Sequence, residues 1–211
     1  MQTGKNTEWD DIWLQRSFIQ KILQVIRKLY SSHFLKLVRP YLNGHSRFLE
    51  IGCGSGSFVI EMAKHVNKSV GIDISDNAVS FSQADAKRNN SKAAFYKASC
   101  YELPFEDDSF DIVWSQGFIQ EIDRPIDCLI EQIRVCSQNG VVLATVPARD
   151  SLLWLMMKAT RPKPLNFLWP WPEQRFYNAE DLFELGMKSG LKAKISKAGI
   201  FRELLILELK R

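Results

Sequence analysis

Short apolar runs alternate with amphipathic segments along most of this chain. The runs have the length and composition of β-strands and cover residues 47–51, 69–73, 93–97, 110–115, 141–146, 192–197 and 203–209. Segments between them place apolar residues three and four positions apart, as one face of a helix does, at 58–66, 76–88, 126–133 and 178–185. This alternation predicts an α/β fold, in which helices cover both faces of a parallel sheet.

Local signals set the expected ends of several elements. Ser75 is a helix-capping residue, Pro125 suits the first turn of a helix, and Asn178 begins a capped helix. The run Gln138-Asn139-Gly140 is typical of a turn, so we expect it to lead into the strand 141–146, which Pro147 ends. From about residue 9 to 42 the spacing of apolar residues also predicts helices.

Composition narrows the class of protein. With 211 residues, 45% hydrophobic and 25% charged, the chain is long enough for one globular domain with a substantial core. No apolar signal core follows the first residues, and the apolar run Leu152–Met157 is far shorter than a membrane span. We therefore expect a cytoplasmic protein.

The cysteines and histidines do not indicate a metal site. The four cysteines form no C-x-x-C pair and the three histidines are scattered, so we expect no bound metal and reduced thiols. The four cysteines are Cys53, Cys100, Cys128 and Cys136.

The net charge of +4 is unevenly distributed. Residues 12–49 contain seven basic residues and no acidic one, and residues 151–178 contain four basic residues and one acidic one. Two basic segments therefore accompany an acidic body, which raises the question of an anionic ligand or surface.

The most informative stretch follows the first predicted strand. Glycines stand at positions 52, 54 and 56, two residues after Glu50, and Asp73 ends the next strand. Glycine permits tight turns and lets a ligand approach main-chain N–H groups, and a carboxylate at the next strand end can accept ribose hydroxyls. A dinucleotide G-x-G-x-x-G motif would need glycine at position 57, where Ser57 stands. The pattern predicts a nucleoside-cofactor site of another type.

This acid-x-G-x-G-x-G pattern, with Asp73 and the loop Leu103–Asp111, resembles the class I S-adenosylmethionine-dependent methyltransferases, small-molecule branch. The resemblance covers about residues 45–211. It implies a Rossmann-like, seven-stranded, mostly parallel sheet and S-adenosyl-L-methionine as cofactor. It also divides one domain into an N-terminal helical lid (1–44), a cofactor-binding core (45–147), an acceptor-side insert (148–178) and a C-terminal helix and strand pair (179–211).

The resemblance also assigns roles at the cofactor site. The three glycines would face the methionine and ribose portion, Asp73 the ribose hydroxyls, and Ile74 the adenine. Glu50 would orient the turn or the amino-acid end, or else cap nearby backbone N–H groups. Cys53 and Cys100 either line the pocket or are small buried residues. The expected cofactor-binding residues are Glu50, Gly52, Cys53, Gly54, Gly56, Asp73, Ile74, Ser99, Cys100, Ser115 and Gln116.

Two positions depart from the family pattern. Ser99 stands where an aspartate would accept from the adenine amino group, and a hydroxyl is a weaker acceptor than a carboxylate. Gln120 and Glu121 stand where many relatives carry two histidines. If the acceptor must lose a proton, Glu121 is the one acid positioned as a base, although a helix-start carboxylate is its alternative role.

The acceptor must be inferred from the lid and the insert. The insert is rich in Leu, Met, Trp and Pro beside basic residues, which favours a bulky apolar or lipid-like acceptor, or contact with an anionic membrane surface. Its alternative role is ordinary core with a solvated basic rim. Ser115–Phe118 replaces the N-P-P-Y signature used on flipped adenines, so we expect no specific nucleic-acid binding. A non-catalytic S-adenosylmethionine or nucleoside binding protein and an RNA methyltransferase stay as alternatives.

Overall fold

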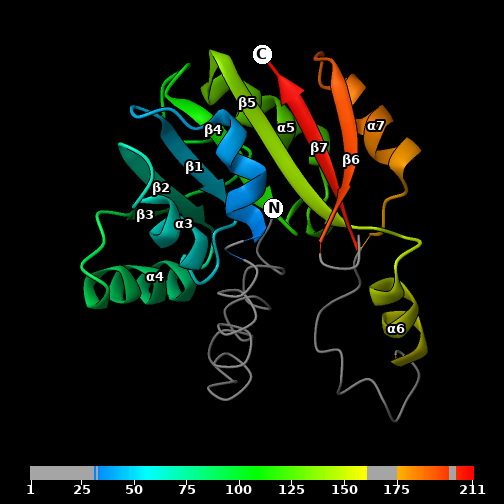
Figure 1. Ribbon diagram of the computed structural model, residues 1–211, viewed down its shortest axis with the longest axis horizontal. Coiled ribbons are helices and arrows are strands. Elements are labelled where there is room, and N and C mark those ends of the chain that lie inside the picture. The colour runs from blue at the N-terminus through cyan, green and yellow to red at the C-terminus, as the bar shows by residue number, and fades with distance from the viewer. Residues whose placement is uncertain (1–30, 32, 161–174, 200–202) are drawn as a thin grey trace.

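The described strands form one seven-stranded sheet in the order β3-β2-β1-β4-β5-β7-β6 (Figure 1). The computed structural model describes residues 31, 33–160, 175–199 and 203–211. Strands β1 to β5 run parallel, β7 is antiparallel to β5, and β6 is antiparallel to β7. This is the mostly parallel sheet that the sequence predicted. The strands are β1 (Arg47–Ile51), β2 (Lys68–Asp73), β3 (Ala94–Lys97), β4 (Phe110–Gln116), β5 (Cys136–Pro147), β6 (Ala193–Ala198) and β7 (Leu204–Lys210).

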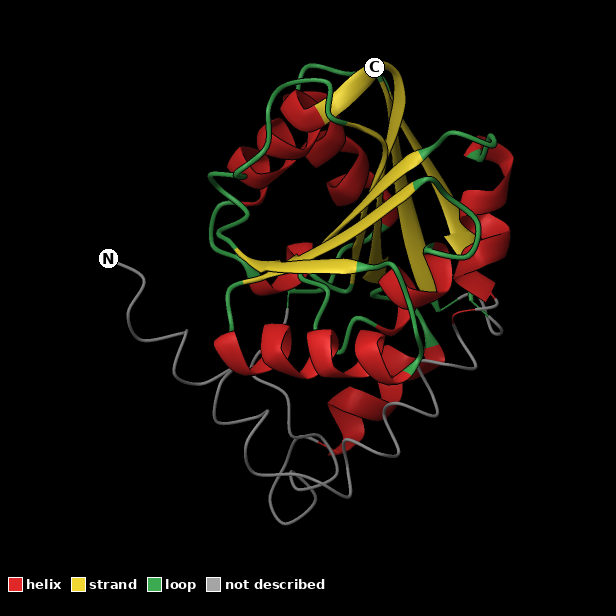
Figure 2. Ribbon diagram, turned by 90° about the vertical axis from the view of Figure 1, so that its left-hand side faces the viewer, coloured by secondary structure: helices red, strands yellow, loops and turns green. Residues whose placement is uncertain are grey.

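Helices pack on both faces of this sheet (Figure 2). Helices α5 and α7 cover the face that carries Leu49, while α3, α4 and the helical residues 33–38 cover the face that carries Phe48. None of the described helices has the length and apolar character needed to span a membrane. The helices are η1 (Arg39–Tyr41), α3 (Ser57–Met62), α4 (Asp76–Arg88), η2 (Ile119–Glu121), α5 (Pro125–Val135), α6 (Leu152–Thr160) and α7 (Ala179–Lys188).

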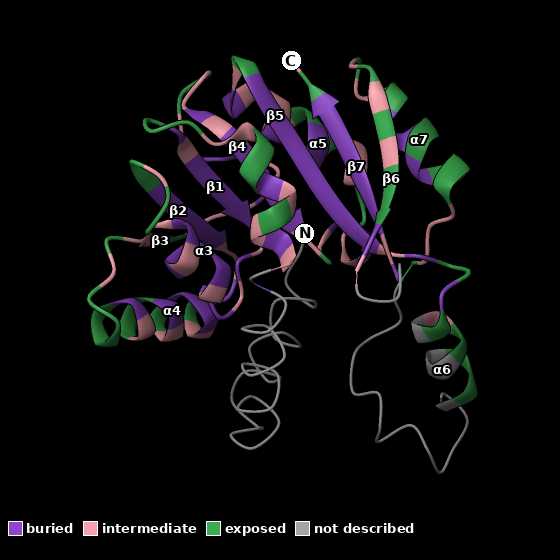
Figure 3. Ribbon diagram, in the orientation of Figure 1, coloured by how far each residue is buried: buried purple, intermediate pink, exposed green. Residues whose placement is uncertain are grey.

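The two faces of the central strands are both buried (Figure 3). On one of them, the Trp114 ring of β4 lies 5.5 Å from the Phe34 ring and 5.4 Å from the Phe58 ring, measured between centroids. Burial on both faces explains why the parallel strands read as nearly continuous apolar runs.

Side-chain caps begin two helices where the sequence placed them. Ser75 Oγ accepts a hydrogen bond from Ala78 N at 3.2 Å, and Asn178 Oδ1 accepts one from Asp181 N at 2.8 Å. Each cap satisfies an N–H group in the first turn that has no partner within the helix. The two helix starts are therefore confirmed.

The expected turn at Gln138-Asn139-Gly140 is wrong. Strand β5 begins at Cys136, directly after α5, and includes these three residues. The pairing with β4 shifts between Phe110–Cys136 and Ile112–Val141, so the extra residues form an irregularity in the strand. Position 140 requires glycine, because the Cβ of any other residue would lie 2.8 Å from Asp111 O and clash with it. The run Gln138-Asn139-Gly140 thus forms a bulge in β5 and not a turn.

Two of the predicted segments are only partly described. Of the N-terminal helical pattern, residue 31 and residues 33–38 are helical, residues 39–41 form η1, and residues 9–30 and 32 lie outside the described residues. The apolar run in the insert forms α6, whereas residues 161–174, with most of the tryptophans and prolines of the insert, also lie outside. Figure 1 shows α6 beyond the sheet edge at which β5 ends.

Candidate functional site

The glycine turn joins β1 to α3 at the carboxyl edge of the parallel strands. Gly52, Gly54 and Gly56 have φ angles of 68°, 52° and 66°, in the left-handed region that favours glycine. Cys53 N donates to Ile72 O at 2.9 Å, and Gly56 N donates to Cys53 O at 2.9 Å. The alternating glycines therefore let the main chain curl above the ends of β1 and β2.

Asp73 fastens this turn to the end of β2. One carboxylate oxygen, Oδ2, accepts from Gly54 N at 2.9 Å, and the other, Oδ1, accepts from Ser75 N at 3.0 Å. A carboxylate offers about four acceptor positions, so acceptor capacity remains after these two bonds. The two sequence signals that indicated a nucleoside site are thus joined by a direct hydrogen bond.

Three side chains that the sequence analysis did not identify support the turn. The Ser82 hydroxyl of α4 lies 2.8 Å from Gly54 O and 2.9 Å from Ala78 O, so its one hydrogen is shared between two carbonyls. Added Cβ atoms would lie 2.2 Å from the Phe118 ring at Gly52 and 2.6 Å from the Phe95 ring at Gly56. Because these residues come from other elements, nothing near the glycines in the sequence indicates them.

A hollow of about 410 Å³, part of it open to solvent, lies beside the turn. Five of the expected cofactor-binding residues line it. One of them is Glu50, which is only 4% exposed. The other six expected residues are not among the lining residues: Gly56, Asp73, Ile74, Ser99, Cys100 and Ser115. The lining residues are Ser31, Glu50, Gly52, Cys53, Gly54, Ser55, Ser57, Phe58 and Gln116.

Ser99 and Cys100 follow β3, next to the end of β2. Ala98 N donates to Asp73 O at 3.0 Å, and Ser99 Oγ accepts from Tyr101 N at 3.3 Å. The structure therefore places the Ser99 segment beside Asp73. Cys100 is buried in the core cluster that also contains Cys128.

The thiols of Cys53 and Cys128 are kept protonated. Burial raises the pKa of Cys53 well above its ordinary value, and the nearby carboxylates of Asp73 and Glu50 act in the same direction. A hydrogen bond with Cys100, together with burial, raises the pKa of Cys128. Since the thiolate is the nucleophilic form, these two cysteines are poor nucleophiles. Both are buried with free thiols.

Ser115 and Gln116 lie next to each other on β4 but on opposite faces. Ser115 stands in register with Ile51 and Ala144, whose side chains pack on the side of α5 and α7, whereas Gln116 lines the hollow. Within the described part of the chain, Ser115 Oγ is buried and makes no hydrogen bond. Ile74 is half-buried, between Asp73 and the Ser75 cap.

Glu121 ends the short helix η2 and is half-buried. It is not among the residues that line the hollow, and its N–H donates to Phe118 O at 2.9 Å. Its position in the first turn of η2 is compatible with both roles that the sequence left open, a base and a helix-start carboxylate. No group of three or more potential metal ligands occurs among the residues that were described.

The donor and acceptor groups of the site suit a nucleoside with a cationic amino-acid tail. Carboxylates of Glu50 and Asp73 can accept from an ammonium group and from ribose hydroxyls, and the Gln116 amide can donate and accept. Gly52 and Gly54 bring main-chain atoms to the lining of the hollow. S-adenosylmethionine has these groups, so the residues present fit it.

Comparison with known proteins agrees with this geometry. Residues 49–144 match a family model described as a methyltransferase domain. The chain is 24% identical over 171 residues to the ubiquinone biosynthesis O-methyltransferase of Roseobacter denitrificans, covering 75% of this chain and 64% of that protein. It is 30% identical over 107 residues to a ubiquinone/menaquinone biosynthesis C-methyltransferase of Citrifermentans bemidjiense, covering 48% of this chain and 46% of that protein. The chain thus spans less than two thirds of the length of these relatives.

A solved structure shares the fold of the described residues. Magnesium protoporphyrin IX methyltransferase from Synechocystis, with bound S-adenosylhomocysteine, superposes with a TM-score of 0.71 at 16% identity, covering 100% of this chain and 96% of that one. Together with the strand order and the glycine turn, these matches identify residues 49–144 as a methyltransferase domain, in a chain with the class I S-adenosylmethionine-dependent methyltransferase fold.

Proposed function

We propose that this protein transfers the methyl group of S-adenosylmethionine to a bulky, apolar small-molecule acceptor. The observation that carries the proposal is the hydrogen bond from Gly54 N to Asp73 Oδ2, because it joins the glycine turn and the carboxylate into one site. The polar hollow lined by Glu50 and Gln116 continues this site on the side of β4.

Placement is the main contribution expected of the protein. The sulfonium of the cofactor supplies an electrophilic methyl group when it is bound. Asp73 accepts hydrogen bonds from the ribose hydroxyls, and Glu50 orients the amino-acid end. Holding the acceptor in line with the methyl group then supplies much of the rate, since orientation alone contributes strongly to bimolecular reactions.

Helix α6 supports an apolar acceptor. Leu152 and Leu155, three positions apart, are 60% and 56% exposed, and the Lys158 ammonium lies 5.2 Å from the Trp154 ring centroid. The helix lies beyond the edge at which the cofactor turn is found (Figure 1). Exposed leucines beside a cation suit a hydrophobic acceptor or an anionic membrane surface. Two relatives whose names refer to ubiquinone biosynthesis point to the same kind of molecule.

Glu121 is our proposed base for an acceptor that must lose a proton. Its place on η2, directly after the end of β4, keeps it near the carboxyl edge, and it is half-buried. Glu121→Gln is expected to remove an acidic limb from the pH–rate profile. An unchanged profile would exclude the base role.

The cofactor assignment is tested by calorimetry with S-adenosylhomocysteine. Asp73→Ala is expected to weaken binding by about a hundredfold or more, because the carboxylate holds both the turn and the ribose hydroxyls. Glu184→Ala, an exposed carboxylate on α7, is the control and should bind like the wild type. Wild-type affinity in Asp73→Ala would refute the site.

The acceptor is sought by incubating the protein with labelled S-adenosylmethionine and fractionated metabolites, lipids or RNA. Label in an apolar small-molecule fraction is the expected result. Label in RNA would instead support an RNA methyltransferase, and binding without any transfer would support a non-catalytic binding protein. Vesicles with and without anionic lipid test the membrane contact, which is excluded if neither binding nor turnover responds to them.

A further inference from the structure

We propose that Glu131 and Arg134 of α5 are positioning residues for the adenine end of the cofactor. They position the adenine end by holding the loop segment 99–105, which follows β3, against α5. This inference rests on the proposed function, since it assumes that the segment around Ser99 lies against the adenine.

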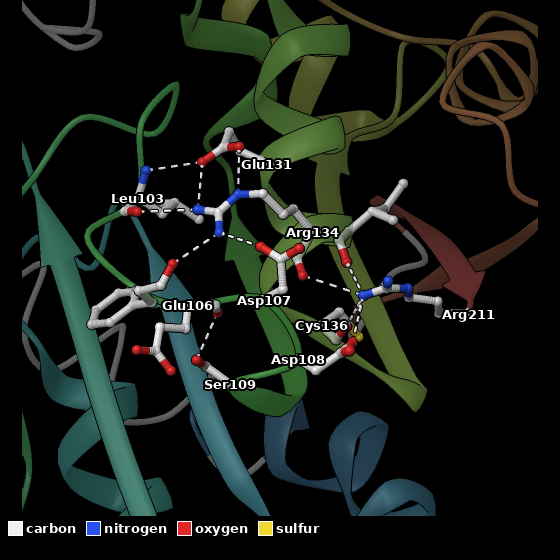
Figure 4. Close-up of polar contacts among 11 residues, drawn as sticks. Leu103, Glu106, Asp107, Asp108, Ser109, Glu131, Arg134, Cys136 and Arg211 are labelled. Carbon is white, nitrogen blue, oxygen red and sulfur yellow. Dashed lines mark hydrogen bonds and ion pairs between the residues drawn. The ribbon is translucent and has the colours of Figure 1, made fainter.

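Arg134 and Glu131 bind the main chain of this segment directly (Figure 4). Arg134 Nη2 donates to Leu103 O at 3.1 Å, and Nη1 donates to Phe105 O at 2.9 Å. Glu131 Oε2 accepts from Leu103 N at 3.0 Å. Three main-chain groups of a segment outside any described strand or helix are therefore satisfied by two side chains of one helix.

The two side chains also hold each other. Arg134 Nε lies 2.8 Å from Glu131 Oε1, and Nη2 lies 2.9 Å from Oε2, so the pair is bidentate. Arg134 also donates to Asp107 Oδ1 at 2.8 Å. The Arg134 guanidinium lowers the pKa of Glu131, which keeps the carboxylate charged. A bidentate pair three positions apart on a helix has a fixed direction, and a lysine ammonium cannot reproduce it.

The segment transmits this position to the cofactor site. Leu103 and Cys100 are buried in the same core cluster, and Ser99 Oγ accepts a hydrogen bond from Tyr101 N at 3.3 Å. At its start, Ala98 N is bonded to Asp73 O. A shift of Leu103 would consequently move Ser99 relative to Asp73, and with it the distance between the adenine and ribose contacts.

A second bidentate pair supplies a matched control. Arg47 Nε and Nη2 lie 3.1 and 2.8 Å from the Asp111 carboxylate oxygens. The arginine side chains are 37% exposed at Arg47 and 30% exposed at Arg134. The Arg47 pair joins the amino-terminal ends of β1 and β4, at the edge of the sheet opposite to the glycine turn. It therefore has a similar chemistry without access to the cofactor.

The test compares Arg134→Lys with Arg47→Lys. We expect Arg134→Lys to weaken S-adenosylhomocysteine binding about tenfold, equal to about 1.4 kcal/mol. The KM for S-adenosylmethionine should rise in parallel, while kcat at saturating cofactor stays within about twofold, because the reacting groups are not touched. Both variants should lower the melting temperature, and by similar amounts. Arg47→Lys should leave both Kd and KM unchanged.

Two outcomes would show that the pair has a purely structural role. In the first, the two variants change Kd equally. In the second, Arg134→Lys lowers the melting temperature but keeps the wild-type Kd. Glu131→Gln gives a second variant, with the same direction expected for Kd. If the wild-type protein does not bind S-adenosylhomocysteine, the proposed function fails, and this inference fails with it. Tight wild-type binding with an indifferent Arg134→Lys variant overturns the positioning role alone.

Discussion

The glycine turn after β1 and the segment 99–105 after β3 lie at the same edge of the sheet but are held in different ways. The turn is shaped by its own main chain, through three left-handed glycines and the bond to Asp73 nineteen residues after Gly54. The segment is held by Glu131 and Arg134, which come from a helix about thirty residues later in the chain. A turn shaped by its own glycines leaves a sequence motif, whereas support from side chains far along the chain does not.

The largest expected effect comes from a substitution in the glycine turn. Gly52→Ala places a Cβ 2.2 Å from the Phe118 ring at a φ of 68°, so both sterics and backbone conformation oppose it. We expect cofactor affinity to fall by about a hundredfold and the free energy of unfolding to fall by about 2 kcal/mol or more. Titration calorimetry and denaturant unfolding measure the two quantities.

Gly44→Ala is the control for this substitution, because nothing lies within 4 Å of an added Cβ there. It should change neither quantity. If Gly52→Ala bound the cofactor as the wild type does, the turn would tolerate side chains and the local account would be wrong.

A smaller effect is expected from the side chain that supports the turn from α4. Ser82→Ala removes the hydroxyl near Gly54 O and leaves a part-buried carbonyl with one fewer donor. We expect a loss of about 1 kcal/mol in stability and a loss of about threefold to fivefold in cofactor affinity. Ser80→Ala, an exposed serine of the same helix, serves as the control. An affinity loss as large as that of Gly52→Ala would show that the turn depends on distant support as much as the segment does.

The smallest expected effect is a pH dependence confined to the segment 99–105. The pKa of Glu131 is lowered from its ordinary value of 4.5, chiefly by the hydrogen bonds from Arg134. Its contribution to stability is therefore present above pH 4.5 and is lost as the pH falls through the lower folded-state pKa. The melting temperature of the wild type should exceed that of Glu131→Gln at pH 7, and this difference should shrink below about pH 4.5. A difference that is the same at both pH values would contradict the ionic origin of the contact.

Much of the fold could be predicted because its signals are local. The seven strands and the caps at Ser75 and Asn178 follow from periodicity and from bonds that span three residues. The expectation failed at Gln138-Asn139-Gly140, where residues typical of a turn form an irregular part of β5. The pairing with β4 decided that conformation, and a single strand does not carry the register of its partner.

At the candidate site, the sequence by itself determined the turn, the acid at the end of β2 and the resemblance to a cofactor-binding family. Only the tertiary structure decided that Phe118 and Ser82 support the turn, that Gln116 and not Ser115 lines the hollow, and that Glu121 is half-buried. The same holds for the pair formed by Glu131 and Arg134. The reason is physical: a glycine conformation or a helix cap depends on neighbouring residues, whereas a side-chain contact between two elements depends on how the whole sheet brings them together.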